Sequence, residues 1–275
     1  MNRQRRTRKF TGTPAAWALA LCFSAPSFSA QIPEAKKIED NSFLIEEAYN
    51  QEDGVIQHIQ TYQLMKDKTW GYTFTQEWPV PKMAHQLSYT IPINHPDPTL
   101  TGLGDILINY RYQLISKEGL SFSPRLSILL PTGDYKQGLG NGSTGVQFNL
   151  PLSVALSNTW VTHWNLGSTI IPDARNAARE TSDLYGFNFG TSFIYLVAEN
   201  FNLMCEGVWN ATENVPKEGA TTMENAFYIN PGFRFALNFK NGLQIVPGLA
   251  APIGIGPSTD NFGLLSYLSF EHPMF

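Results

Sequence analysis

The chain has 275 residues and a formal net charge of −4, with 15% charged and 13% aromatic residues. The charged fraction is well below the ~25% of an average soluble domain, while the aromatic content suits the two aromatic girdles of a transmembrane β-barrel. After residue 30, no stretch has the ~20 consecutive apolar residues that a transmembrane helix needs. A membrane-spanning form of this chain would therefore cross with strands. Nucleic acid is excluded as a partner, because an acidic exported chain binds it poorly.

Residues 1–30 are predicted to be a signal peptide. The short apolar stretch Ala15–Ala25 follows a basic region that contains Arg3, Arg5, Arg6, Arg8 and Lys9. This order of a basic and a short apolar region is typical of a secretory signal. Cleavage between Ser27 and Ala30 would remove all five basic residues and take the net charge to about −9.

Residues 31–53 lack the pattern of a barrel strand and are predicted to be a periplasmic segment or a plug folded into a lumen. Asn41 or Ser42 could cap a short helix over residues 43–51, with acidic residues in its first turns. A first strand that pairs with the next is the alternative. The candidate plug residues are Phe43, Leu44, Glu46, Glu47 and Tyr49.

From Gly54 to Phe275 the chain is predicted to be an all-β, transmembrane, up-and-down antiparallel barrel. About twelve strands are separated by turn signals, an even number within the range of bacterial barrels. The predicted strands are 54–64, 69–80, 85–94, 104–115, 119–130, 144–156, 159–171, 184–197, 201–212, 225–239, 243–255 and 262–275.

Alternation within these strands separates an apolar face from a polar face. In Phe227–Phe239, Phe233, Phe235 and Leu237 share one face, and Arg234 lies on the other. Because strand side chains alternate, the first set is predicted to face lipid and Arg234 to face a wet lumen. Cys205, the single cysteine left after signal cleavage, falls on an apolar face, where it is expected to be a lipid-facing hydrophobe.

The predicted connections alternate between short and mostly longer segments, as in outer-membrane barrels with short periplasmic turns and longer outer loops. The short set is 82–84, 116–118, 157–158, 198–200 and 240–242, and the longer set is 95–103, 131–143, 172–183, 213–224 and 256–261. Twelve strands place both termini on the short-turn side. Outer-membrane lipid and the barrel-assembly machinery, which would read the final strand ending in Phe275, are the expected partners, and an oligomer is open.

Two features of the strand pattern are irregular. Prolines 151, 231, 247 and 252 fall inside predicted strands, where a proline lacks a ladder donor, so bulges or strand ends are expected there. In the last strand, Leu264, Leu268 and Phe270 have the parity opposite to Phe275. A bulge near Pro273 would reconcile the two sets.

The sequence shows no constellation for catalysis, and neither a metal nor a cofactor is expected. The histidines are scattered, and a nucleophile elbow is absent. The polar residues of interest are instead those predicted to point into the lumen, where charge must be hydrated or paired. They are Glu77, Asp105, Arg111, Arg125, His163, Glu206, Arg234 and Glu271. They would either fill the lumen as a structural lattice or set solute selectivity, and these roles are compatible.

Four short motifs resemble those of a known family. They are Gly102-Leu-Gly-Asp105, Tyr110-Arg-Tyr112, Pro124-Arg-Leu126 and Leu130-Pro-Thr-Gly-Asp134. Through them the chain, from about Phe43 to its C-terminus, resembles the outer-membrane barrels of the MetA-pathway phenol-degradation family, which is grouped with the Fap-type pores that secrete functional amyloid. The resemblance implies a pore of about twelve strands and, from the Fap-type member, a helical N-terminal plug. It assigns no substrate-binding residue.

The leading functional hypothesis is an outer-membrane channel of a Gram-negative cell for small hydrophobic or aromatic solutes or for an exported polypeptide. A non-transporting barrel with a surface-binding or structural role is the alternative. A membrane-embedded lipid enzyme is a third hypothesis, which no group of residues supports.

Overall fold

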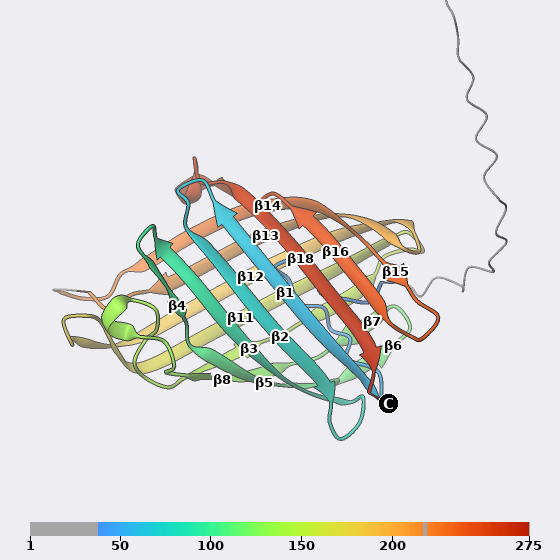
Figure 1. Ribbon diagram of the computed structural model, residues 1–275, viewed down its shortest axis with the longest axis horizontal. Helices are drawn as coiled ribbons and strands as arrows, with labels where there is room; N and C mark the ends of the chain where they lie inside the picture. Colours follow the sequence, from blue (N-terminus) through green and yellow to red (C-terminus); the bar gives the residue numbers. More distant parts are fainter. Residues whose placement is uncertain (1–37, 217–218, 275) are drawn as a thin grey trace, which may run out of the picture. The chain divides into compact units, whose positions relative to one another are not determined.

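The computed structural model describes residues 38–216 and 219–274, and its strands form one closed antiparallel sheet (Figure 1). β1 (Val55–Met65) pairs both with β2 (Trp70–Pro79) and with the last strand, β18 (Gly263–Pro273). Closure removes the unpaired edges that a sheet would otherwise expose. Residues 1–37, which include the predicted signal peptide, and the terminal Phe275 lie outside the described residues.

The eighteen strand segments make up twelve barrel strands, as the sequence predicts. Seven barrel strands are continuous: β1, β2, β3 (His85–Asp97), β11 (Trp160–Arg175), β12 (Thr181–Ala198), β13 (Phe201–Glu213) and β18. The others are interrupted: β4 (Leu100–Leu103) with β5 (Ile106–Tyr112) and β6 (Ile115–Lys117), β7 (Leu120–Phe122) with β8 (Arg125–Leu130), β9 (Gly145–Asn149) with β10 (Leu152–Ala155), β14 (Met223–Phe235) with β15 (Leu237–Asn238), and β16 (Gln244–Ala250) with β17 (Ile253–Ile255).

Prolines account for some of these interruptions. Pro151 separates β9 from β10, and Pro252 separates β16 from β17. Pro231 and Pro247 instead remain inside β14 and β16, opposite Cys205 and Leu268. Bulges and strand ends were expected at all four positions, and breaks occur at two of them.

The two faces of the sheet differ as the alternation predicts. Phe233 and Leu237 are exposed on the outer face of the barrel, and Arg234 is buried inside it. In the last strand, Leu264 and Leu268 are likewise exposed outward, while Glu271 is buried. An apolar outer face around a polar interior is the arrangement expected of a barrel wall surrounded by lipid.

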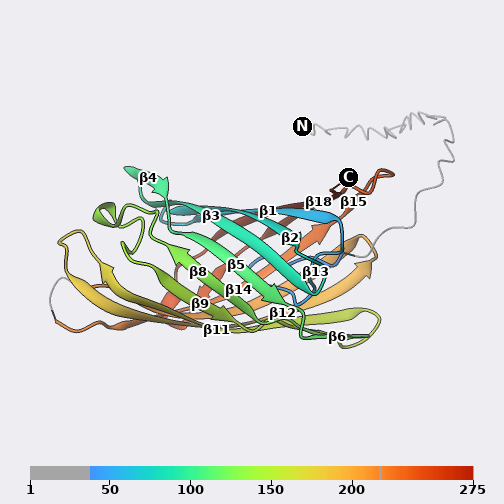
Figure 2. The same cartoon turned by 90° about the horizontal axis from the view of Figure 1, so that it is seen from below.

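The two ends of the barrel differ in their connections (Figure 2). At the turn end, strands are joined by 80–84, 118–119, 156–159, 199–200 and 239–243. At the loop end they are joined by 66–69, 98–99, 131–144, 176–180, 214–222 and 256–262. The prediction of a long connection at 95–103 is wrong, because β3 continues to Asp97 and β4 begins at Leu100. The loop expected at 172–183 is likewise shorter, because its ends extend the ladder of β11 and β12.

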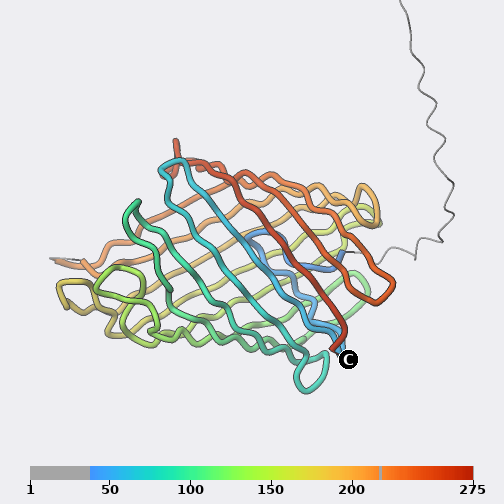
Figure 3. The backbone as a smooth tube through the Cα atoms, in the orientation of Figure 1, coloured from blue at the N-terminus to red at the C-terminus, as the bar shows by residue number. Residues whose placement is uncertain are grey.

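Residues 38–53, named here the luminal segment, lie inside the barrel toward the turn end (Figure 3). The helix expected over residues 43–51 does not form, and the backbone there is irregular. In the described chain the helical elements are two single 3₁₀ turns, Tyr135–Gln137 and Gly256–Ser258. None of the helices in that part of the chain is long and apolar enough to cross a membrane.

The outward-facing residues of β12 test the depth of the apolar band. Phe189 lies near the middle of the strand and Thr181 at its loop end, and both are exposed. Phe189→Arg is expected to destabilise the barrel in lipid by roughly 2–4 kcal/mol, and Thr181→Arg by about 0–1 kcal/mol, because charge costs most at the bilayer midplane. Urea unfolding in lipid vesicles measures both, and equal costs would contradict this placement of the wall.

Candidate functional site in the barrel lumen

The irregular backbone of the luminal segment is hydrogen-bonded by side chains of the barrel wall. One carboxylate oxygen of Glu206 accepts the amides of Leu44 and Ile45 at 2.9 and 3.2 Å. Asn165 accepts the amide of Glu46 at 2.9 Å and donates to its carbonyl at 2.8 Å. Three more wall acceptors serve the amides of the later part of the segment: Ser153 for Ala48, Gln113 for Asn50 and Gln86 for Gln51. Since a buried peptide group without a partner costs about 1–3 kcal/mol, this match allows a non-helical chain to remain inside.

Two buried arginines hold carbonyl groups of the same segment. Arg111 of β5 donates to the carbonyls of Glu47 and Tyr49 at 3.0 and 2.5 Å. Arg234 of β14, which is 1% exposed, donates to the carbonyl of Asp40 at 2.8 Å and to the next carbonyl at 2.5 Å. Both guanidinium groups therefore serve backbone that would otherwise be unpaired.

The luminal segment follows the inner wall around the barrel, and Gln57 joins its two ends. Contacts from Asp40 to Gln51 reach β18, β14, β13, β11, β10, β5 and β3 in turn. Two further contacts join Ser42 to Ser192 of β12 and Glu46 to Arg125 of β8. Gln57 of β1 then donates to the Asp40 carboxylate at 2.7 Å and accepts from the Gln51 side chain. The Tyr267 hydroxyl of β18 donates to the same Asp40 oxygen at 2.6 Å. The segment is thus a ring within the barrel.

Glycines of the wall receive the apolar side chains of the ring. A Cβ at Gly232 or Gly248 would lie 2.6 Å from the ring of Phe43, and one at Gly190 would overlap Ile45. Phe43 also packs edge-on against Tyr267, with ring centroids 5.8 Å apart. The absence of a side chain at these glycines therefore leaves the room that Phe43 and Ile45 occupy.

Two carboxyl groups of the ring are fully buried. Burial raises the pKa of Asp40, although the Arg234 charge and the hydrogen bond from Tyr267 act to lower it. Burial also raises the pKa of Glu47 well above its usual value, and the Asp40 charge raises it further, while Arg111 and Arg234 lower it. The closed lumen thus favours the protonated forms of both acids.

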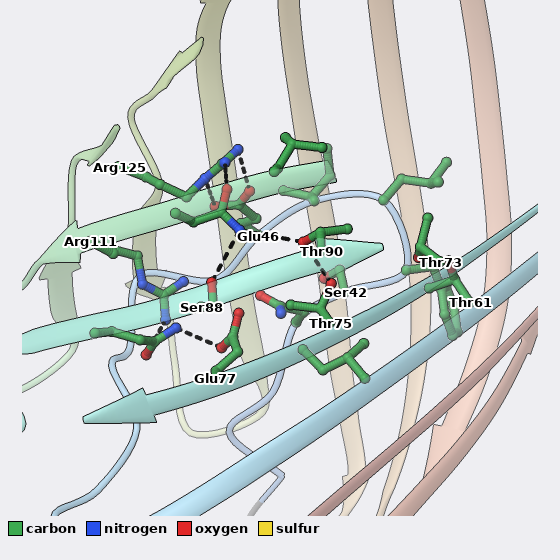
Figure 4. Close-up of a pocket in the computed structure, with 18 of the residues that line it drawn as sticks. Ser42, Glu46, Thr61, Thr73, Thr75, Glu77, Ser88, Thr90, Arg111 and Arg125 are labelled. Carbon is green, nitrogen blue, oxygen red and sulfur yellow. Dashed lines mark hydrogen bonds and ion pairs between the residues drawn. The ribbon is translucent and has the colours of Figure 1, made fainter. Parts of the chain in front are cut away.

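Of the cavities that flank the luminal segment, three are lined in part by Leu44. Their volumes are about 240, 250 and 180 Å³. The first presents a set of hydroxyl groups (Figure 4): Thr61, Thr73, Thr75, Ser88 and Thr90. The second presents amides: Gln147, Asn149, Asn165, Asn188 and Asn210. Leu44, which is 39% exposed, is an apolar contact at the meeting point of these polar walls.

An ion pair borders both of the first two cavities. Arg125 of β8 donates through Nε to one oxygen of Glu46 at 3.0 Å, and its terminal nitrogen lies 2.8 Å from the other oxygen. Both residues line both cavities, and Figure 4 shows their side chains pointing toward each other. This two-point geometry is the stronger form of an arginine–carboxylate contact.

The remaining inward candidates lie around the ring. Glu77 accepts from the Gln86 amide at 2.6 Å, His163 lies 2.7 Å from the Ser153 hydroxyl, and Glu271 is buried. In residues 38–216 and 219–274, no three side chains of metal-ligating type gather in one place.

Asp105 lies apart from the other candidates, at the loop end. Its carboxylate accepts the amides of Gly133 and Asn141 at 3.0 and 2.8 Å and the Asn141 side chain at 2.9 Å. Thr132 adds a hydrogen bond to the carbonyl of Gly104 at 2.8 Å. The two motifs that contain these residues therefore fold loop 131–144 against β5.

The family model described as "Putative MetA-pathway of phenol degradation" matches residues 49–252. The chain belongs to this family. Among solved structures it is similar to the COG4313 outer membrane channel from Pseudomonas putida F1, with 12% identity, a TM-score of 0.57 and coverage of 82% of this chain and 97% of that one. It is also similar to the NanC porin, with 6% identity, a TM-score of 0.54 and coverage of 78% and 98%. No curated protein sequence matches the chain.

These similarities show that this member of the phenol-degradation family has the fold of outer-membrane channels. The luminal segment enters the family match only at residue 49, so most of it lies before the matched region.

Sequence reasoning missed the amide and hydroxyl groups that hold the ring. The sequence predictions are limited to charged inward residues and His163. They therefore leave out five uncharged residues that bind the ring: Gln57, Gln86, Gln113, Ser153 and Asn165. Their inward parity was readable in the strand pattern. Their role was not, because it depends on where the irregular segment passes.

Gly248→Ala is expected to loosen the luminal segment, because the added methyl group overlaps the Phe43 ring. Overpacking of this kind costs about 1–3 kcal/mol. Hydrogen exchange of the amides of residues 42–48 should accelerate accordingly. Gly71→Ala is the control, since a Cβ there meets only the Asn94 side chain, at 3.9 Å. Equal protection of these amides from exchange in both variants would show that the contact between Gly248 and Phe43 does not hold the segment in place.

The raised pKa values of Asp40 and Glu47 predict a pH dependence. A carboxyl group with a raised pKa in the docked state binds more protons there than in the released state, so docking is strongest at low pH and weakens as pH rises through the raised pKa. Exchange of the segment's amides, corrected for the intrinsic rate, should therefore increase as the pH rises from the ordinary carboxyl pKa through the raised pKa values of Asp40 and Glu47. Glu47→Gln should remove most of this change, and Asp67→Asn in an exposed turn should leave it intact.

Proposed function

We propose that the protein is an outer-membrane channel whose lumen is closed by the luminal segment acting as a plug. The observation that carries the proposal is the ring itself, in which wall side chains bind the backbone of residues 40–51 around the barrel. Membership of the phenol-degradation family and the fold of an outer membrane channel and a porin support it. A cleaved signal peptide would export the chain, with the turn end toward the periplasm.

For the cargo, we propose small aromatic solutes that carry a hydrogen-bonding group. The cavities combine hydroxyl and amide side chains with the exposed Leu44, which favours such molecules over pure hydrocarbons. The description of the family agrees with this class. The lumen-facing candidates nearest these cavities are Glu77, Arg111 and Arg125.

An exported polypeptide is the second candidate cargo. The luminal segment is itself an irregular chain whose peptide groups are bound by wall side chains, so a lumen of this kind can accommodate an extended backbone. The resemblance to the Fap-type secretion pores points the same way. Outer-membrane lipid, and the assembly machinery acting on the strand that ends in Phe275, complete the proposed partners.

Planar-bilayer conductance tests the channel. Full-length protein should conduct little, and deletion of residues 31–53 should raise conductance, because the wall closes through β1 and β18 without the segment. Arg234→Gln, which weakens the hold on Asp40, should give an intermediate value, and Arg179→Gln in an outer connection should match the unaltered protein. A folded barrel, recognised by its heat-dependent gel shift, that conducts in none of these forms would instead favour a binding or structural role.

A further inference from the structure

Arg125 differs from the two other arginines that touch the luminal segment. Arg111 and Arg234 donate to backbone carbonyls of the segment, and Arg111 also donates to the neutral side chain of Asn50. Arg125 instead pairs with a side-chain carboxylate, that of Glu46. Its partner is thus a group that a solute molecule could also carry.

The wall holds the Arg125 guanidinium in place independently of Glu46. One terminal nitrogen donates to Asn109 at 2.9 Å and to the Ser127 hydroxyl, and the other donates to Gln147 at 2.9 Å. These neutral acceptors orient the guanidinium without neutralising it. Its remaining edge, with Nε, faces the Glu46 carboxylate. A preorganised guanidinium that presents two donors along one edge is a carboxylate-binding group.

This group is accessible from the cavities. The Arg125 side chain is 13% exposed and that of Glu46 is 28% exposed, and both border the cavities of about 240 and 250 Å³. Leu44 borders the same two cavities and offers an apolar surface beside the ion pair. A compact apolar body attached to a carboxylate would match this pair of contacts.

We propose that Arg125 is the binding site for the carboxylate of a small aromatic acid, and that Glu46 is a built-in competitor that occupies the site in the closed state. The inference rests on the proposed channel function and narrows its substrate class. The solute carboxylate replaces Glu46 on Nε and the terminal nitrogen of Arg125, while its ring lies against Leu44.

The backbone contacts of Glu46 explain how the exchange can occur without first expelling the segment. Asn165 binds both the amide and the carbonyl of Glu46, so the main chain stays in place when the side chain swings away. The loss of the ion pair nevertheless removes one attachment of the segment to β8. Because coupling between two ligands is reciprocal, a solute that displaces Glu46 weakens closure to the same extent that closure weakens solute binding.

Isothermal titration calorimetry of sodium benzoate into the full-length protein in detergent, at fixed ionic strength, tests the proposal. Glu46→Gln removes the competing charge and should tighten benzoate binding about tenfold, within the usual range of such coupling. Arg125→Gln should abolish binding, and Arg125→Lys, which keeps the charge but loses the two-point geometry, should weaken it relative to Arg125. Glu118→Gln and Arg179→Gln, in exposed connections, are the matched controls and should bind as the unaltered protein does. Benzyl alcohol, a neutral analogue, should not respond to Glu46→Gln.

Each outcome separates this proposal from the channel proposal. Benzoate affinity that is the same in the Glu46 and Arg125 variants as in the unaltered protein overturns the site, even if deletion of residues 31–53 opens a conducting pore. Glu46→Gln that raises conductance without tightening benzoate also overturns it, since Glu46 would then be an anchor only. Benzoate binding that follows the expected order in a barrel that never conducts supports the site and rejects the channel. The heat-dependent gel shift verifies that each variant is folded.

Discussion

The structure depends on one constraint: a chain that enters a barrel without forming a helix or a strand must find a partner for every peptide group. The wall supplies many of these partners with carboxylate, amide, hydroxyl and guanidinium side chains, and Asn41 of the segment itself accepts the amide of Glu47. Glu206 serves two successive amides, and Asn165 serves both sides of Glu46. The inward polar residues are therefore first of all the complement of one irregular path.

This constraint also explains what the sequence could and could not foretell. The strands, their number and their two faces follow from a period of two, which any residue of the wall obeys irrespective of what lies inside. Arg234 was placed inward on parity alone, and the structure buries it. The helix expected over residues 43–51 does not form because a short helix has little stability of its own, whereas the wall offers many of its peptide groups alternative partners. The residues next to Phe43 and Glu47 in the sequence do not indicate these partners, because the partners lie on strands that are distant in sequence.

Charge was a partial guide to the interior. Arg111, Arg125, Glu206 and Arg234 meet the ring, but Asp105, chosen by the same rule, folds an outer loop 131–144 instead. Parity gives the face of a residue and not its depth along the barrel, so the two roles look alike in sequence. The role of the glycines that contact Phe43 and Ile45 could not be predicted either, because it depends on which side chain packs against each glycine.

The position of Gln57 has a consequence for the seam of the barrel. Gln57 lies in β1, pairs across the barrel seam with Glu271 of β18, and donates to Ser269 of the same strand at 3.1 Å. The same side chain links Asp40 to Gln51. The first strand of the barrel thus carries a side chain that contacts both the last strand and the two ends of the luminal segment. Because the seam and the luminal segment share this side chain, a substitution at Gln57 would disturb the closing pair of strands and the two ends of the segment together.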